Sequence, residues 1–202
     1  MKGWLTDYQK LGGNRGVGVS EYGAGASIQH HEQNPKQPSP GGKWHPEEWQ
    51  AVVHEENWRC IREADYCWGS FIWNMFDFAS EWRDEGDAPG MNDKGLVTYD
   101  RKTHKDAFYF YQANWADVPM LHLTSKRHTT RKQADTPVKV YSNAPEVTLA
   151  VNGKRIGSAK TDSLRIARWE SVKLQPGGNR IEVRAERDGK ALTDLAEWVL
   201  EP

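Results

Sequence analysis

Glu21 stands at the C-terminal end of residues 16–20, a Gly/Val run that is followed by a Gly/Ala turn. The run is suited to a buried strand. In α/β folds the side chains that do chemistry project from the C-terminal ends of strands, so a carboxylate here is placed to act as a nucleophile or as a general acid or base. A solvated or salt-bridged loop acid is the alternative interpretation, and the position taken alone favours that alternative.

The first half of the chain alternates strand and helix signals. Pro46 in the first turn, followed by two acids, opens a helix. Apolar side chains then recur at helical spacing and predict one apolar face, formed by Trp49, Val52, Val53, Cys60 and Ile61. Residues 69–74 are predicted to form a second buried strand. Residues 103–115 have some strand propensity, but a capping-box pattern and a shared face favour a helix. This order is the alternation of a parallel α/β sheet.

The second half changes character near Ala116. Short alternating runs follow one another, separated by turn signals such as residues 176–179. The runs lie at residues 120–124, 138–141, 147–151, 169–174 and 180–185. Asn152-Gly153 is a strong signal for a two-residue hairpin. The pattern predicts an antiparallel β-sandwich.

The composition limits the classes of partner. A net charge of -1 and a pI near 6.7 give no electrostatic reason to expect nucleic acid or an acidic membrane surface. The chain has no apolar run of the length that a transmembrane helix needs. Cys60 and Cys67 are interpreted as buried free thiols. Eight of the ten tryptophans lie in the first 115 residues, which fits a core with an aromatic-lined cleft.

Two groups of side chains contain metal-ligating types. A histidine-rich group is formed by His30, His31, Glu32 and His45. An acidic group in a glycine-containing loop is formed by Glu81, Asp84, Glu85 and Asp87. The acidic spacing does not match a known calcium loop. We interpret the first group as the polar rim of a cleft and the second as a solvated or salt-bridged lid.

Three motifs occur in order along the chain. They are Ser-Glu-Tyr-Gly-Ala-Gly at residues 20–25, Trp-Asn-Met-Phe-Asp-Phe at residues 73–78 and Asn-Asp-Lys-Gly-Leu-Val-Thr-Tyr-Asp-Arg-Lys at residues 92–102. Together they resemble the glycoside hydrolase family 2 enzymes, the β-galactosidases and β-glucuronidases. The likeness continues through residues 105–111 and into residues 140–154, so it covers essentially the whole chain.

The resemblance implies a fold that is α/β plus all-β. Residues 1–116 would be the last two strand–helix units of a (β/α)8 TIM barrel, the C-terminal part of a catalytic domain. Residues 117–202 would be an immunoglobulin-like β-sandwich domain. The chain as a whole would be the C-terminal part of a longer enzyme.

The resemblance also implies roles for individual residues. Glu21 corresponds to the nucleophile of a retaining glycosidase, and Tyr22 of the same motif is counted as substrate-binding. Trp73 corresponds to a ring that lines the sugar subsite. Asn92 and Lys94 correspond to an Asn-x-Lys pair that binds the glycone and, in β-glucuronidases, holds the substrate carboxylate.

One departure from the family pattern is serious. Retaining hydrolysis requires a second carboxyl group roughly 5 Å from the nucleophile, to protonate the leaving oxygen. The family carries it in an Asn-Glu motif on an earlier barrel strand, and this chain has no Asn-Glu dipeptide. We therefore expect the isolated chain to be inactive and, with apolar edges and faces exposed, poorly soluble.

The leading prediction is a retaining exo-β-galactosidase that forms a glycosyl-enzyme intermediate on Glu21. A β-glucuronidase or other uronidase is the alternative, motivated by Asn92 and Lys94. A non-catalytic sugar-binding or structural module is the alternative of another class. The expected partners are a carbohydrate substrate and the N-terminal part of the enzyme, with a homo-oligomer left open. No cofactor, metal, nucleic acid or membrane is expected, and the localisation is not determined.

Overall fold

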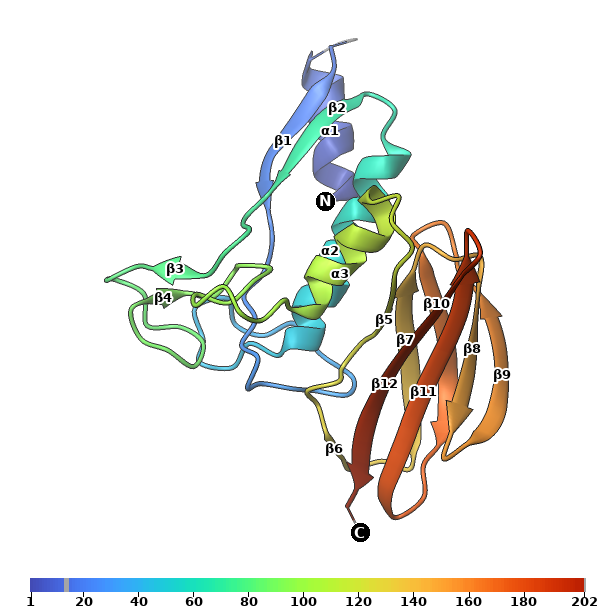
Figure 1. The fold of residues 1–202 in the computed structure, drawn as a ribbon. Coiled ribbons are helices and arrows are strands. Elements are labelled where there is room, and N and C mark those ends of the chain that lie inside the picture. Colours follow the sequence, from blue (N-terminus) through green and yellow to red (C-terminus); the bar gives the residue numbers. More distant parts are fainter. Residues whose placement is uncertain (13–14, 202) are drawn as a thin grey trace. The chain divides into compact units, whose positions relative to one another are not determined.

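The computed structural model describes residues 1–12 and 15–201, and the chain divides into two compact units (Figure 1). The first, called here the α/β unit, comprises Met1–His30 and Pro35–Ala107. The second, called here the sandwich unit, comprises His31–Asn34 and Phe108–Pro202, of which Pro202 lies outside the described residues. Within the described part of the chain, no helix combines the length and the apolar character needed to cross a membrane.

The α/β unit is built around a parallel pair of strands. Its elements are α1 (Lys2–Gly12), β1 (Val17–Tyr22), α2 (Glu47–Glu63), β2 (Cys67–Ile72), β3 (Phe78–Ala79) and β4 (Met91–Asn92), and α3 (Asp106–Trp115) begins at its end. Strands β1 and β2 lie side by side in the same direction, with Tyr22 opposite Ile72 (Figure 1). A parallel pair needs a long crossover, which contains α2. The predicted strand–helix–strand–helix order is confirmed, and α1 was not predicted.

The second strand differs from its prediction. Strand β2 spans Cys67–Ile72 instead of residues 69–74, and none of its side chains is buried. Trp68 is 71% exposed and Phe71 is 62% exposed. The reason is that the sheet has two strands among the described residues. No further strand of the described chain pairs with its outer edges, so the apolar side chains of β2 stay exposed. Cys60 in α2 and Cys67 in β2 are free thiols, as predicted, but they are only partly buried, so the prediction that they are buried is wrong.

The interior face of α2 is polar, so the predicted apolar face is wrong. Of the five apolar side chains assigned to that face, only Ile61 is buried. The buried side chains of α2 are Glu47, Glu48, Gln50, Ala51, His54, Glu55 and Ile61. The physical reason is that the helix packs on loop backbone, whose polar groups need hydrogen-bond partners. Gln50 Nε2, for example, donates to the carbonyls of Ala24 and Gly95 at 2.9 and 3.2 Å. Pro46 is the N-cap residue of α2 and lies outside its first turn.

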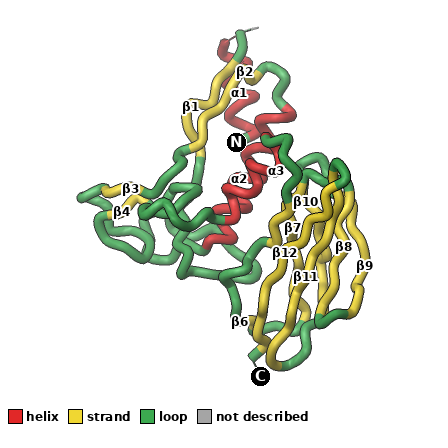
Figure 2. Tube along the Cα trace, in the orientation of Figure 1, coloured by secondary structure: helices red, strands yellow, loops and turns green. Residues whose placement is uncertain are grey.

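The sandwich unit contains two sheets, drawn as yellow strands in Figure 2. Their strand orders are β10-β7-β5 and β6-β12-β11-β8-β9. The strands are β5 (Leu121–Leu123), β6 (Thr130–Arg131), β7 (Asp135–Ser142), β8 (Glu146–Val151), β9 (Lys154–Lys160), β10 (Ile166–Lys173), β11 (Gly177–Arg187) and β12 (Lys190–Leu200). Neighbours are antiparallel except β6 and β12.

Apolar side chains of both sheets meet in one buried cluster, which confirms the predicted β-sandwich. Val138 and Val140 come from the smaller sheet, and Leu149, Ile181 and Trp198 come from the larger one. Burial of this cluster is the main driving force available to the unit.

The hairpin predicted at Asn152-Gly153 is confirmed. It joins β8 and β9, and both residues have positive φ, 52° and 77°, as a type I′ turn requires. Residues 176–179, predicted as a turn, are only partly one, because β11 already begins at Gly177. Strands β6 and β12 were not predicted.

Candidate active site

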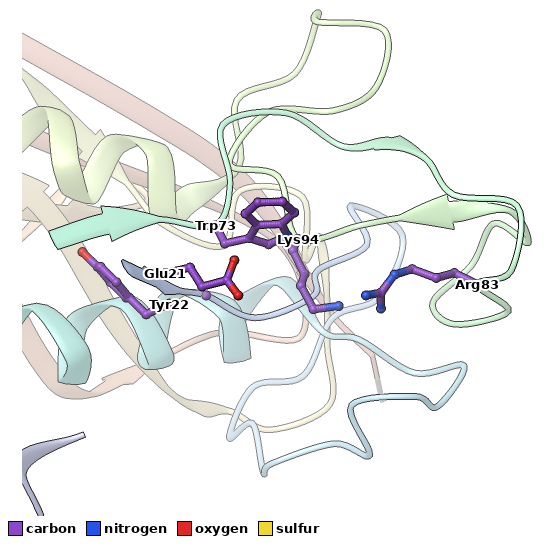
Figure 3. Close-up of a pocket in the computed structure, with 6 residues that line it drawn as sticks. Glu21, Tyr22, Trp73, Arg83 and Lys94 are labelled. Atoms are coloured by element: carbon purple, nitrogen blue, oxygen red, sulfur yellow. The ribbon is translucent and has the colours of Figure 1, made fainter. Parts of the chain in front are cut away.

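One pocket of about 420 Å³ gathers most of the predicted site residues (Figure 3). It is lined by Glu21, Tyr22, Gly23, Trp73, Arg83 and Lys94. Four of the five site residues predicted from the sequence are in this lining. Asn92 is not, and Arg83 lines the pocket although no pattern in the sequence selects it.

The parallel pairing of β1 and β2 brings Glu21 and Trp73 together. Tyr22 lies opposite Ile72, and the Trp73 amide donates to the Tyr22 carbonyl at 2.8 Å. Carboxyl ends of parallel strands meet at the same edge, so residues separated by more than fifty positions become neighbours there. Glu21 is exposed on the pocket side, and Trp73 is 42% exposed.

Gly23 and Tyr22 fix the chain just after the carboxylate. A Cβ atom on Gly23 would lie 2.0 Å from the Trp73 carbonyl oxygen, so only glycine allows the two segments to approach this closely. Tyr22 is buried, and its ring lies 5.9 Å from that of His54, centroid to centroid. Burial lowers the pKa of His54 to about 3, and the charge of Lys105 acts in the same direction. His54 is therefore a neutral packing partner beneath the strand end.

Asn92 shapes the turn that carries Lys94. Its side chain is almost completely buried, and its Oδ1 accepts the Lys94 amide at 3.1 Å. This short-range bond between a side chain and the backbone two residues later is typical of an Asx turn. In this structure Asn92 thus contacts Lys94 and does not line the pocket.

Lys105 connects three segments of the α/β unit by hydrogen bonds from its buried ammonium group. Its Nζ donates to the Ala26 carbonyl at 2.6 Å, to Asp77 Oδ1 at 2.8 Å and to the Asp93 carbonyl at 2.9 Å. Asp77 Oδ1 also accepts the Gly95 amide at 2.8 Å. Burial raises the pKa of Asp77, with Lys105 opposing the rise. The loop on both sides of Lys94 is therefore held by buried polar contacts.

His45 and Asp93 form a second buried pair beside Lys94. His45 Nδ1 lies 2.7 Å from Asp93 Oδ2. This hydrogen bond raises the pKa of His45, against the effect of burial. Burial alone would raise the pKa of Asp93, but the hydrogen bond from His45 and the charges of His45 and Lys105 outweigh it, so that this pKa lies below its usual range. Both shifts favour a charged pair under the Lys94 loop.

The histidine-rich group of the sequence does not come together as one site. His45 pairs with Asp93, His30 stacks on Trp44 with ring centroids 4.4 Å apart, and His31 belongs to the sandwich unit. Across the described residues, no three His, Cys, Asp or Glu side chains are grouped as metal ligands would be.

Two of the four acids in the loop between β3 and β4, Asp84 and Glu85, form salt bridges, which agrees with the prediction of a solvated or salt-bridged loop. Asp84 pairs with Lys43 at the surface. Glu85 is buried, and its Oε1 accepts from Arg83 Nη1 at 2.7 Å and from Lys94 Nζ at 2.9 Å. The ion pair with Glu85 therefore holds Arg83, a residue of this loop, at the pocket.

Known proteins with similar sequences carry the names of two glycosidase activities. The chain is 51% identical over 179 residues to a "Beta-glucuronidase" of Bacteroides fragilis, covering 88% of this chain and 26% of that protein. It is 33% identical over 144 residues to "Beta-galactosidase BoGH2A" of Bacteroides ovatus, covering 70% of this chain and 16% of that protein. Both relatives, like the motifs above, are of the family 2 type. The chain belongs to glycoside hydrolase family 2.

A solved structure agrees with this assignment. This chain is similar to the FMN-binding beta-glucuronidase from Facaelibacterium prausnitzii L2-6, with a TM-score of 0.88 and 38% sequence identity. The match covers 100% of this chain and 30% of that chain. Residues 133–193 also match a family model described as "Domain of unknown function (DUF4982)". The chain spans about a quarter of the first relative and less of the second.

Proposed function

We propose that this family 2 chain supplies the nucleophile side of the active site of a retaining β-glycosidase. The observation that carries the proposal is the convergence of Glu21, Trp73 and Lys94 on one pocket from two strand ends and a loop. A carboxylate, a flat ring and a cation are the groups needed to attack a sugar, to stack on it and to hold its polar substituents.

In the proposed reaction, a Glu21 oxygen attacks the anomeric carbon and the bond to the leaving oxygen breaks. A second carboxylic acid gives its proton to that oxygen, and a glycosyl ester of Glu21 remains. Water then attacks the anomeric carbon, the second carboxylate takes the proton, and Glu21 leaves as a carboxylate. Among the described residues that line the pocket, Glu21 is the only acid. The second acid is therefore proposed to come from the N-terminal part of the same enzyme.

This proposal includes the domain assignment. Residues 1–116 would be the last strand–helix units of a (β/α)8 barrel, and residues 117–202 an immunoglobulin-like domain. The parallel β1–α2–β2 unit supports the first assignment, and the two-sheet sandwich supports the second. The exposed rings on β2 support an N-terminal partner segment, because large uncovered apolar surfaces mark contact sites.

For the substrate, we propose a terminal β-D-glucuronoside. Two cationic side chains, Arg83 and Lys94, line the pocket, and a uronide brings a carboxylate that such groups bind. The relative of 51% identity is named a β-glucuronidase. A β-galactoside, the first expectation from the sequence, is the second candidate, because another relative is named a β-galactosidase. Comparison of aryl β-glucuronide and aryl β-galactoside hydrolysis by the complete enzyme decides between them.

The role of Glu21 can be tested by trapping the intermediate. A 2-fluoro glycoside with a good leaving group should add one fluorosugar to the peptide that contains Glu21, as seen by mass spectrometry. Glu21→Gln should prevent labelling and lower kcat by about 10⁴-fold or more. Glu56→Gln, which changes an exposed acid of α2 outside the pocket, is the matched control and should retain wild-type activity. Labelling at another residue, or none in an active enzyme, would refute the assignment.

A further inference from the structure

Glu85 is a buried acid that touches both cations of the pocket without lining the pocket itself. Its side chain is 8% exposed, against 20% for Lys94 and 39% for Arg83. Both cations donate to the same oxygen, Oε1, at 2.7 and 2.9 Å. Glu85 therefore lies behind the two cations, and the cations are the groups that a ligand would meet.

Arg83 and Lys94 lie close together although both side chains are positively charged. In Figure 3 the ammonium end of Lys94 and the guanidinium of Arg83 are turned toward each other. Because each lies within 3 Å of one Glu85 oxygen, the two positive charges are close neighbours that would repel each other without the intervening carboxylate. An ammonium has three donors and a guanidinium has five, so one bond to Glu85 leaves each cation able to bind a further acceptor.

The backbone holds Glu85 in place independently of Lys94. The next residue, Gly86, has φ +65° and donates its amide to the Gly42 carbonyl at 2.9 Å. A Cβ atom on Gly86 would lie 2.4 Å from Asp93 Oδ2, so this segment is pressed against the buried His45–Asp93 pair. The carboxylate is thus positioned by the fold before any ligand arrives.

We propose that Glu85 is a positioning residue for the carboxylate site that the family resemblance assigns to Lys94. It holds Arg83 beside Lys94, so that Arg83 is a second donor to the carboxylate of an anionic sugar. The cluster has two positive charges and one negative charge, so it has one positive charge to offer to one carboxylate. A carboxylate has two oxygens and can accept from both cations at once. The proposal rests on the proposed function for the identity of the pocket, and it adds Arg83 and Glu85 as residues that determine specificity.

The test compares an anionic and a neutral substrate in the complete enzyme. Arg83→Gln and Glu85→Gln should each lower kcat/KM for an aryl β-glucuronide by about 10- to 100-fold, mainly through KM. With the matching aryl β-glucoside or β-galactoside, kcat/KM should change by less than about 3-fold. Glu85→Asp should restore part of the uronide activity. Asp84→Asn, which removes a neighbouring acid paired only at the surface, is the control and should behave as the wild type.

Direct binding separates this proposal from the proposed reaction. The Kd of free D-glucuronate, measured by calorimetry, should rise about 10-fold or more in Arg83→Gln and Glu85→Gln, with no matching change for D-glucose. Equal losses on anionic and neutral ligands would show a merely structural role and overturn the proposal, as would unchanged uronide binding. If Glu21 is labelled by a neutral fluorosugar but neither variant affects uronides, the positioning role fails and the reaction stands. If Glu21 is not labelled but the binding shifts appear, the reaction fails and the positioning role stands.

Discussion

The two units of this chain differ in the kinds of side chain that dominate their interiors. The sandwich unit has an apolar core drawn from both sheets, with Leu149, Ile181 and Val183 fully inaccessible. In the α/β unit the buried side chains are largely polar or charged. They include His45, Glu47, Glu48, Gln50, His54, Glu55, Asp77, Glu85, Asn92, Asp93 and Lys105.

This difference separates stability from positioning. Apolar burial stabilises a fold without fixing directions, because the hydrophobic effect is non-directional. Hydrogen-bonded charges are directional, and each depends on its partners because an unpaired buried charge is strongly unfavourable. The polar contacts of the α/β unit meet at the loops that carry Lys94 and Glu85, so their specificity serves the candidate site.

The aromatic residues follow the same division. Trp4, Trp68, Phe71 and Trp82 are all more than 60% exposed in the α/β unit, whereas Trp198 is buried in the sandwich. None of the eight tryptophans in the first 115 residues is buried, so the expectation that they form a core is wrong. Trp73 in the pocket does agree with the expected aromatic lining.

The largest expected change in stability is at Lys105. Lys105→Met leaves Asp77 buried without its cation, which should destabilise the α/β unit by about 3–5 kcal/mol. Hydrogen exchange should then accelerate around Ala26 and Gly95 while the sandwich strands keep their protection. Lys173→Met, at an exposed position of β10, should change stability by less than about 0.5 kcal/mol. Unchanged exchange around Ala26 in Lys105→Met would mean that the polar network is not what holds this unit.

Leu149→Ala tests the other side of the comparison. Leu149 is completely buried in the cluster between the sheets, so the cavity should destabilise the sandwich unit by about 2–5 kcal/mol. Exchange should accelerate in β8 and β11 and stay unchanged in α2. Thr148→Ala, on the opposite face of the same strand, should have an effect below about 0.5 kcal/mol. Equal effects from both positions would contradict an inside–outside division of β8.

The sandwich could be predicted well from the sequence because its signals are local. Alternation with period two and the Asn152-Gly153 turn depend on neighbouring residues only. Strand β12 was missed, although its buried residues Ala196, Trp198 and Leu200 alternate in the same way. The exposed Leu195 and Val199 are sequence neighbours of these residues, so both faces of the strand carry apolar side chains and the alternation is hidden.

The α/β unit could be predicted only in outline. The order of strands and helices was evident, but the polar interior of α2 was not, because its partners are loop carbonyls and amides far away in the sequence. The ordered motifs placed Glu21, Trp73 and Lys94 among the candidates, and all three line one pocket. Arg83 reaches that pocket through an ion pair with Glu85, and such a contact leaves no periodic pattern in the sequence.

Acid should destabilise the α/β unit through His54, which is completely buried. Below pH 6.5 the unfolded chain binds a proton at His54, whereas the folded pKa of about 3 keeps the ring neutral. Stability is therefore lost as the pH falls, by about 2 kcal/mol at pH 5 for this group. Urea unfolding at pH 7 and pH 5 should show that this loss is smaller in His54→Gln.

His45 provides the control of opposite sign. Its pKa is raised in the folded state, so its contribution is complete below the unfolded pKa and is lost as the pH rises through the folded pKa. His45→Gln should accordingly change the alkaline limb of the stability profile and leave the loss attributed to His54 in place. A variant pair with indistinguishable profiles would contradict the assignment of the two histidines.

The smallest expected effect lies in a sandwich turn, where stability depends on backbone conformation and not on a directional contact. Gly153 has φ +77°, and a Cβ atom there would meet nothing within 4 Å. Gly153→Ala should therefore destabilise the unit by about 1 kcal/mol through backbone strain alone. Gly178→Ala is the matched control, because this site is equally open but has no positive φ, and its effect should stay within about 0.5 kcal/mol. Denaturation midpoints of the sandwich measure both, and equal shifts would show that the φ requirement is not what selects glycine at the hairpin.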